Sequence, residues 1–191
     1  MYKRQERAYG AQPGQTGRLK ARLVVQDNAT LHWLPQETIV YEHSALRRKL
    51  SADLAPTARF LMVEPIVFGR QAMGETLRDA EFHDRIEIRR AGQLLYLDGV
   101  KLHGDVTAHL DRPAVGNGAR AMANLIWVAP EASGALELSR SLIGTTGGAS
   151  MLCDDVMVMR LLACDSFELR RNLVPLLNHL TKNALPQNWR L

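Results

Sequence analysis

The chain has 191 residues, of which 46% are hydrophobic and 23% charged, an ordinary balance for one globular domain with a sizeable core. Its net charge of +4 is small for a nucleic-acid-binding domain, in which basic residues usually form a concentrated stripe. No apolar run reaches the roughly 18 residues that a membrane-spanning helix needs. We therefore expect no nucleic-acid or membrane partner, whereas the charge remains compatible with an acidic protein partner.

The cysteines and the first residues bear on the cellular compartment. Cys153 and Cys164 form no CxxC pair and no small-domain disulfide framework. Both lie beside apolar residues, which predicts buried free thiols, and free thiols fit a reducing compartment. The first residues lack the apolar region of a secretory signal. These features predict a cytoplasmic protein.

Residues 1–18 have no periodic apolar pattern and contain several glycines and a proline. This composition predicts a flexible lead-in. Residues 1–5, Met-Tyr-Lys-Arg-Gln, resemble the translation of a transposon sequencing adapter, so we expect them to be non-native and the gene to have been cut upstream. A single domain is predicted over residues 19–191.

From residue 19 onward, short segments alternate between apolar and polar residues, which is typical of strands with one buried face. Segments of this kind cover residues 19–25, 29–33, 39–41, 46–54, 82–88, 94–98 and 100–102. Arg48 interrupts the apolar face of the segment 46–54. Pro35 cannot donate to a strand ladder, so it marks a strand end or an edge.

Three further segments are nearly all apolar, which predicts strands buried on both faces. They cover residues 60–68, 125–128 and 156–163. Helical patterns are confined to the C-terminal part of the chain. Residues 132–142 suit a short helix, and a longer one follows the capping pair Asp165 and Glu168. Pro175 lies inside the longer helix and is expected to kink it.

No sequence motif indicates catalysis. The six histidines show no metal-binding spacing such as HxH or HExxH. The glycine-rich residues 144–148 lack the Lys-Ser/Thr that ends a phosphate-binding loop, and no serine has the context of a nucleophile elbow.

Two carboxylates stand out by their apolar surroundings. Glu64 lies in the middle of the apolar segment 60–68, and Asp98 ends another apolar segment. An unpaired buried carboxylate costs several kcal/mol, so a salt bridge with a nearby arginine such as Arg70 or Arg85 is the structural interpretation. The functional alternative is a polar passage for a small hydrated cation. Oxygen ligands alone hold a divalent transition-metal cation loosely, which suits transfer better than storage.

Several strings in a fixed order resemble one known family, the urease accessory protein UreD (UreH) family. The sharpest is Trp-Leu-Pro-Gln-Glu-Thr-Ile at residues 33–39, and the second is Gly-Arg at 69–70 with Gly-Glu at 74–75. Two strand segments near residues 85–88 and 95–98, the proline-containing helix and the terminal Pro-Gln-Asn-Trp-Arg are also similar. The family-pattern residues are Trp33, Gln36, Glu37, Arg70 and Glu75.

The resemblance covers about residue 19 to the C-terminus, roughly the C-terminal two-thirds of the family pattern. It implies a mainly β fold of layered, helically wound sheets with about two helices, the longer one near the C-terminus. It also implies a non-enzymatic chaperone of urease maturation. Such proteins bind apo-urease and UreF, reach the GTPase UreG through UreF, and pass nickel transiently. On this interpretation Glu64 and Asp98 line the nickel passage.

Two alternatives remain open at the level of sequence. A β-rich ligand-binding or protein-interaction module without catalysis would need exposed aromatic side chains, and the chain has few. An enzyme that uses Glu64 and Asp98 as a carboxylate pair would need them about 5–10 Å apart in an open cleft.

Overall fold

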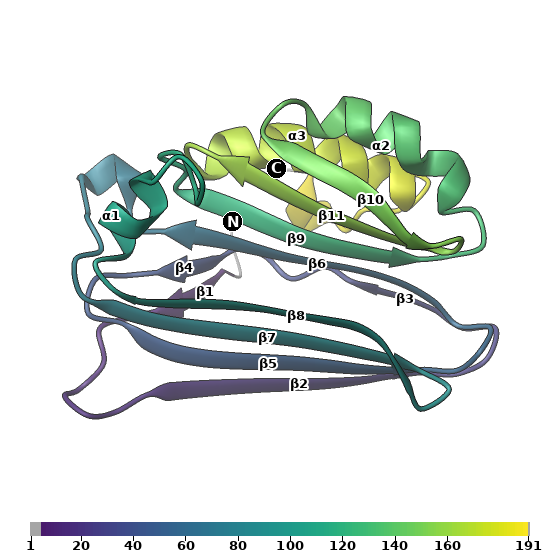
Figure 1. Ribbon diagram of the computed structural model, residues 1–191, viewed down its shortest axis with the longest axis horizontal. Coiled ribbons are helices and arrows are strands. Elements are labelled where there is room, and N and C mark those ends of the chain that lie inside the picture. The colour runs from purple at the N-terminus through teal and green to yellow at the C-terminus, as the bar shows by residue number, and fades with distance from the viewer. Residues whose placement is uncertain (1–4, 191) are drawn as a thin grey trace.

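The computed structural model describes residues 5–190 and consists of two β-sheets stacked face to face, with helices on one side (Figure 1). The seven-stranded sheet contains β1 (Glu6–Ala8), β3 (Thr30–Trp33), β4 (Thr38–Val40), β6 (Arg59–Phe68), β9 (Ala121–Val128), β10 (Gly147–Cys153) and β11 (Val156–Ala163). The four-stranded sheet contains β2 (Gly17–Val25), β5 (Ala45–Leu54), β7 (Ala80–Arg90) and β8 (Gln93–Gly104). The prediction of a mainly β, layered fold is confirmed.

The chain winds from one sheet to the other and back. It passes from β2 to β3 and β4, returns to β5, crosses to β6 and returns to β7. Successive turns therefore stack strands in parallel, β2 on β5 on β7 in one sheet and β3 and β4 on β6 in the other. The later strands are antiparallel, with the order β6-β9-β11-β10 at the far side of the larger sheet.

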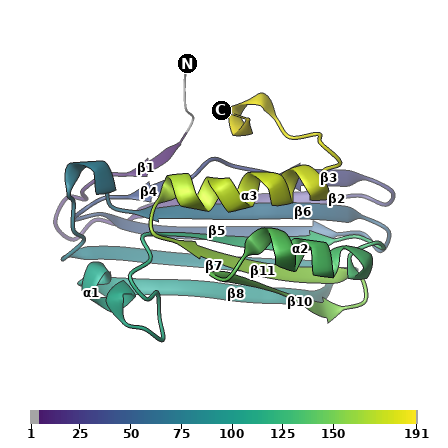
Figure 2. The same cartoon turned by 90° about the horizontal axis from the view of Figure 1, so that it is seen from above.

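Two helices cover the outer face of the seven-stranded sheet, α2 (Leu136–Ile143) and α3 (Ser166–Leu180) (Figure 2). Both were predicted, and the side chain of Asp165 caps α3 by accepting a 2.8 Å hydrogen bond from the amide of Glu168. A third helix, α1 (Val106–Asp111), was not predicted because its six residues are too few to show a helical period. Three short 3₁₀ turns complete the fold: η1 (Gln71–Met73), η2 (Ser133–Ala135) and η3 (Gln187–Trp189).

β6 lies at the centre of the molecule, between the two layers of side chains. Leu61 and Val63 face the helices, whereas Phe60 and Met62 face the four-stranded sheet. All four are almost completely buried, so the prediction of a strand buried on both faces is confirmed. The helix layer is one continuous apolar cluster. The layer between the sheets holds two separate apolar clusters.

Other expectations are changed by the structure. Cys153 and Cys164 are both exposed, because they lie at the end of β10 and just after β11 rather than inside strands. Within the predicted lead-in, β1 pairs in parallel with β4, and β2 already begins at Gly17. Of the adapter-like residues 1–5, residues 1–4 lie outside the described part of the chain. In residues 5–190 no helix is both long and apolar enough to cross a membrane.

Candidate functional site

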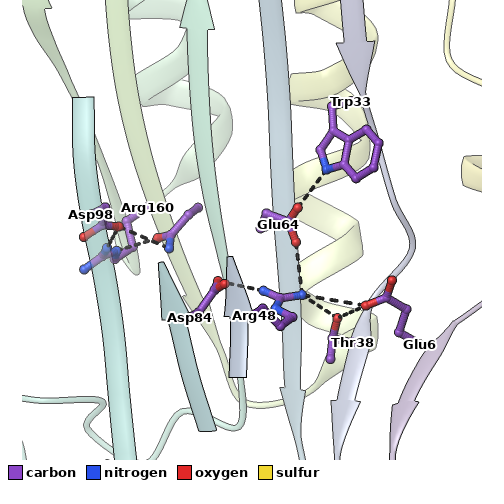
Figure 3. Close-up of polar contacts among 9 residues, drawn as sticks. Glu6, Trp33, Thr38, Arg48, Glu64, Asp84, Asp98 and Arg160 are labelled. Carbon is purple, nitrogen blue, oxygen red and sulfur yellow. Dashed lines mark hydrogen bonds and ion pairs between the residues drawn. The ribbon is translucent and has the colours of Figure 1, made fainter. Parts of the chain in front are cut away.

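Glu64 points from β6 into the layer between the sheets and is 7% exposed. The indole Nε1 of Trp33 donates a 2.8 Å hydrogen bond to its Oε1, and Arg48 Nη1 lies 3.1 Å from its Oε2 (Figure 3). Both partners come from other strands, Trp33 from β3 in the same sheet and Arg48 from β5 in the opposite sheet. The carboxylate therefore links the two sheets.

Arg48 is the centre of this cluster and is only 6% exposed. Its Nη2 lies 2.7 Å from Asp84 Oδ2, and its Nη1 donates a 2.6 Å hydrogen bond to Thr38 Oγ1. The Nη1 atom also lies 4.0 Å from the carboxylate of Glu6, which is half exposed at the edge of the layer. One guanidinium thus faces three carboxylates, from β1, β6 and β7.

This imbalance of charge is reflected in the ionisation of the cluster. Burial raises the pKa of Glu64 above its ordinary value, and this outweighs the opposite effect of Arg48, while the carboxylates of Asp84 and Glu6 raise it further. Burial alone would lower the pKa of Arg48, but Glu64 and Asp84 raise it. The guanidinium therefore stays charged, whereas Glu64 retains its proton to a higher pH than an ordinary glutamate does.

Asp98 belongs to a second ion pair in the same layer. Its Oδ2 lies 2.5 Å from Arg160 Nη2 and accepts a 3.4 Å hydrogen bond from Asn124 Nδ2. Arg160 Nε also donates to Asn124 Oδ1 at 2.6 Å. Asn124 is the cross-strand partner of Glu64 on β9, so its buried side chain lies beside the first cluster on the same sheet face.

Together these residues form what we call the inter-sheet polar belt. It consists of Glu6, Trp33, Thr38, Arg48, Glu64, Asp84, Asp98, Asn124 and Arg160. The successive strands β1, β4, β6, β9 and β11 of the seven-stranded sheet each contribute one polar side chain, and β3, which also pairs with β6, contributes Trp33. The strands β5, β7 and β8 of the four-stranded sheet contribute the facing side chains. The belt runs from half-exposed Glu6 at one edge of the layer to half-exposed Arg160 at the other. It separates the two apolar clusters.

The prediction that arginines pair with Glu64 and Asp98 is confirmed, but the predicted partners Arg70 and Arg85 are wrong. Glu64 and Asp98 pair with Arg48 and Arg160, whereas the side chains of Arg70 and Arg85 are about half exposed elsewhere. Sequence reasoning noticed Arg48 but gave it no role, and it missed Asp84. The alternation of β7 could have identified Asp84, because this residue takes an inward position between the apolar residues Phe82 and Ile86.

The geometry does not provide an open cleft for a catalytic carboxylate pair. Glu64 borders a cavity of only about 20 Å³, enough for about one water molecule, and Asp98 does not line it. Among residues 5–190, no group of three or more His, Cys, Asp or Glu side chains is arranged to hold a metal ion.

Gln36 and Glu37 have a different role from the belt, because they anchor α3 and the C-terminal segment. The carboxylate of Glu37 is 1% exposed and lies 2.7 Å from Arg170 Nη1 on α3. Arg170 also donates to Gln36 and to the carbonyl of Trp189, and its guanidinium stacks 5.0 Å from the Trp189 ring. The indole of Trp189 in turn donates to the carbonyl of Leu34. Burial opposes ionisation of Glu37, but the hydrogen bond from Arg170 keeps its pKa below the ordinary value.

Arg70 and Glu75 hold the loop around η1 closed. Arg70 donates to Glu75 from its backbone amide at 2.8 Å and from its guanidinium at 3.0 Å, and these bonds lower the pKa of Glu75. Gly69 makes the turn at φ +77°, and a Cβ there would lie 3.1 Å from the carbonyl oxygen of Glu75. The Gly-Arg and Gly-Glu pairs therefore fix the conformation of this loop.

The fold and the belt define a class of protein: a helically wound two-sheet domain with charged side chains in the layer between its sheets. Comparison with known proteins identifies the family. The sequence model of the UreD urease accessory protein family matches residues 5–190. The chain belongs to this family.

Curated relatives agree over almost the whole chain. It is 56% identical over 186 residues to the urease accessory protein UreD of Roseobacter denitrificans, covering 97% of this chain and 68% of that protein. The corresponding protein of Ruegeria pomeroyi is 50% identical over 184 residues, with 96% and 72% covered. The protein of Ruegeria sp. is 48% identical, and 65% of its length is covered. The chain thus spans about two-thirds of these relatives, and membership of the family supports a role in urease maturation.

Proposed function

We propose that the chain acts as a non-enzymatic chaperone of urease maturation, in the cytoplasm, and assists the delivery of nickel to the urease active site. In this proposal it binds apo-urease and UreF, and UreF connects it to UreG, which supplies the GTPase activity. Nickel is cargo that the chain passes on rather than a cofactor that it retains. The family membership supports the role, and the relatives' name as accessory proteins fits a chain without catalysis.

The observation that carries the nickel proposal is the inter-sheet polar belt. A layer between two sheets is normally apolar, yet here one buried guanidinium faces three carboxylates. The excess negative charge favours a cation, and the belt reaches the surface at both edges of the layer. Its oxygen ligands are hard and few at any one point, so they would bind nickel weakly and release it.

The proposal is tested by reconstituting urease with purified apo-urease, UreF, UreG, GTP and nickel, with this chain as the accessory protein. Two isosteric variants, Glu64→Gln and Asp98→Asn, are expected to reduce the nickel content of urease several-fold. Asp154→Asn, which changes an exposed carboxylate in the turn between β10 and β11, is the matched control and should have no effect.

Complex formation is measured in parallel by pull-down with UreF and with apo-urease. If both belt variants assemble normally and deliver nickel as well as the wild type, the passage is refuted and the chain acts as an interaction module. If the wild type binds neither partner, while the Roseobacter denitrificans protein binds its own, the maturation role of this chain is refuted.

A further inference from the structure

The outer face of the four-stranded sheet carries an unusual density of positive charge. In β5 the inward residues are apolar apart from Arg48, and the residues between them point outward, away from the helices (Figure 1). The other three strands follow the same alternation in register. The outward basic residues, which we call the basic sheet face, are Arg18, Lys20, Arg22, Arg47, Lys49, Arg85, Arg89 and Lys101.

The outward carboxylates on this sheet are fewer: Asp53, Glu81 and Glu87. The excess of basic over acidic groups on this face is larger than the net charge of +4 of the whole chain. The rest of the molecule is therefore slightly acidic, and the positive charge of the protein is concentrated on one flat surface. No helix or strand of residues 5–190 covers this surface.

Intramolecular ion pairs neutralise only part of the basic sheet face. Arg22 pairs with Asp53 at 3.1 Å and Arg47 with Glu81 at 2.8 Å. Glu87 is shared by Lys49, Arg85 and Arg89. In the described part of the chain, Arg18, Lys20 and Lys101 have no ion-pair partner, and all three are exposed.

The register places like charges directly opposite each other. Arg18 is the cross-strand partner of Arg47, and Lys20 is the partner of Lys49. Arg47 is in turn the cross-strand partner of His83, and His83 is the partner of Lys101, so this row of basic side chains spans all four strands. Like charges in such positions destabilise a sheet. The arrangement therefore does not serve the stability of the isolated domain.

We propose that the basic sheet face is a docking surface for a carboxylate-rich patch on a folded protein partner in urease maturation. The three interspersed carboxylates would repel a phosphate backbone, but they suit the mixed charges of a protein interface. Among the outward positions of these strands there is no Phe, Tyr or Trp on which a base could stack. This inference rests on the proposed function for the identity of the partners to be tested.

The test is charge reversal at the three residues without ion-pair partners. The variant Arg18→Glu/Lys20→Glu/Lys101→Glu breaks no internal ion pair. The matched control Arg78→Glu/Arg112→Glu/Arg190→Glu changes the net charge equally at exposed positions on other surfaces and also breaks no internal ion pair of the described residues. Dissociation constants for apo-urease and for UreF are measured at low and at physiological salt. Circular dichroism checks that both variants are folded.

We expect the reversed variant to bind one of the two partners roughly tenfold more weakly at low salt, and the difference to shrink as salt rises. The control variant should bind both partners as the wild type does. Equal binding of both partners by the reversed variant and the wild type overturns the inference but leaves the proposed function intact. An equal loss in the control variant also overturns it, because the effect would then be one of net charge.

Duplex DNA and phosphatidylserine vesicles serve as competing probes. If charge reversal abolishes binding to either probe while partner binding is unchanged, the face does not serve a protein partner and the inference is wrong. If the wild type binds neither apo-urease nor UreF, the proposed function fails, and the inference fails with it.

Discussion

The two faces of the seven-stranded sheet are packed by different chemistry. Toward α2 and α3 the side chains form one continuous apolar cluster, in which Leu173 and Leu176 are completely buried. Toward the four-stranded sheet the apolar packing is interrupted by the inter-sheet polar belt. Burial of apolar side chains explains this cluster, and the Glu37–Arg170 ion pair at its margin also holds α3. Buried ion pairs seldom add stability over an apolar alternative, so stability does not explain the belt.

The largest expected effect comes from removing the central cation of the belt. Arg48→Ala leaves Glu64 and Asp84 buried without a counter-charge, and breaking a buried pair in this way costs about 3–5 kcal/mol. Chemical denaturation should show this loss of unfolding free energy at neutral pH. A loss below about 1 kcal/mol would mean that water enters the belt freely and that its charges are solvated.

Truncating an apolar side chain in the helix layer should cost less unfolding free energy. A different apolar side chain of similar volume should restore most of it. Leu173→Ala leaves a cavity and is expected to cost about 3 kcal/mol. Leu173→Met keeps the volume and should cost less than about 1.5 kcal/mol. Both values are measured by denaturation as for Arg48→Ala. If Leu173→Met proves as damaging as Leu173→Ala, the helix layer depends on more than apolar volume.

The contact between Glu37 and α3 is expected to have a smaller effect. Arg170→Ala removes the ion pair with Glu37 and the stacking on Trp189, but its guanidinium is partly exposed, and Gln5 still donates to Glu37. We expect a loss of about 2 kcal/mol. Limited proteolysis should show earlier cleavage after residue 180. Unchanged cleavage would show that the C-terminal segment is held by other contacts.

The smallest effect, and the most specific, is in the pH dependence of stability. Glu64 has a raised pKa in the folded state, so the protein loses stability as pH rises from the ordinary value of 4.5 through the folded pKa. Glu64→Gln removes this loss, and the variant should gain on the wild type as pH increases. Glu37 has a lowered pKa, so its contribution is present above 4.5 and is lost as pH falls. Glu37→Gln should therefore show the opposite trend.

Much of the fold was predictable because its signals are local. Alternation identified the strands of the four-stranded sheet, and the continuous apolar run identified β6. Both larger helices were indicated, one by the capping residue Asp165 and the other by its pattern. The winding of the chain between sheets was implied only by the family resemblance, because alternation shows which residues share a face but not which strands pair.

The site was predictable only in part. The sequence indicated Glu64 as a charged residue in an apolar strand and Arg48 as a charged residue on an apolar strand face. No local sequence pattern shows that the two side chains are in contact. Their contact depends on β5 and β6 lying in opposite sheets. Glu37 and Arg170 are 133 residues apart, and their pairing depends on where α3 packs. Proximity in sequence favoured Arg70 and Arg85 as partners of Glu64, and tertiary structure decided otherwise.

The most direct test of whether the belt serves nickel transfer rather than stability is the nickel content of urease matured with one triple variant. Arg48→Met/Glu64→Gln/Asp84→Leu removes the buried charges together and keeps an acceptor for Trp33. The only charge that loses its partner is that of Glu6, which is half exposed and solvated, so the variant should fold with an unfolding free energy within about 1.5 kcal/mol of the wild type. We predict that this stable variant delivers several-fold less nickel than the wild type. Wild-type nickel content would contradict the account and leave the belt as a structural feature.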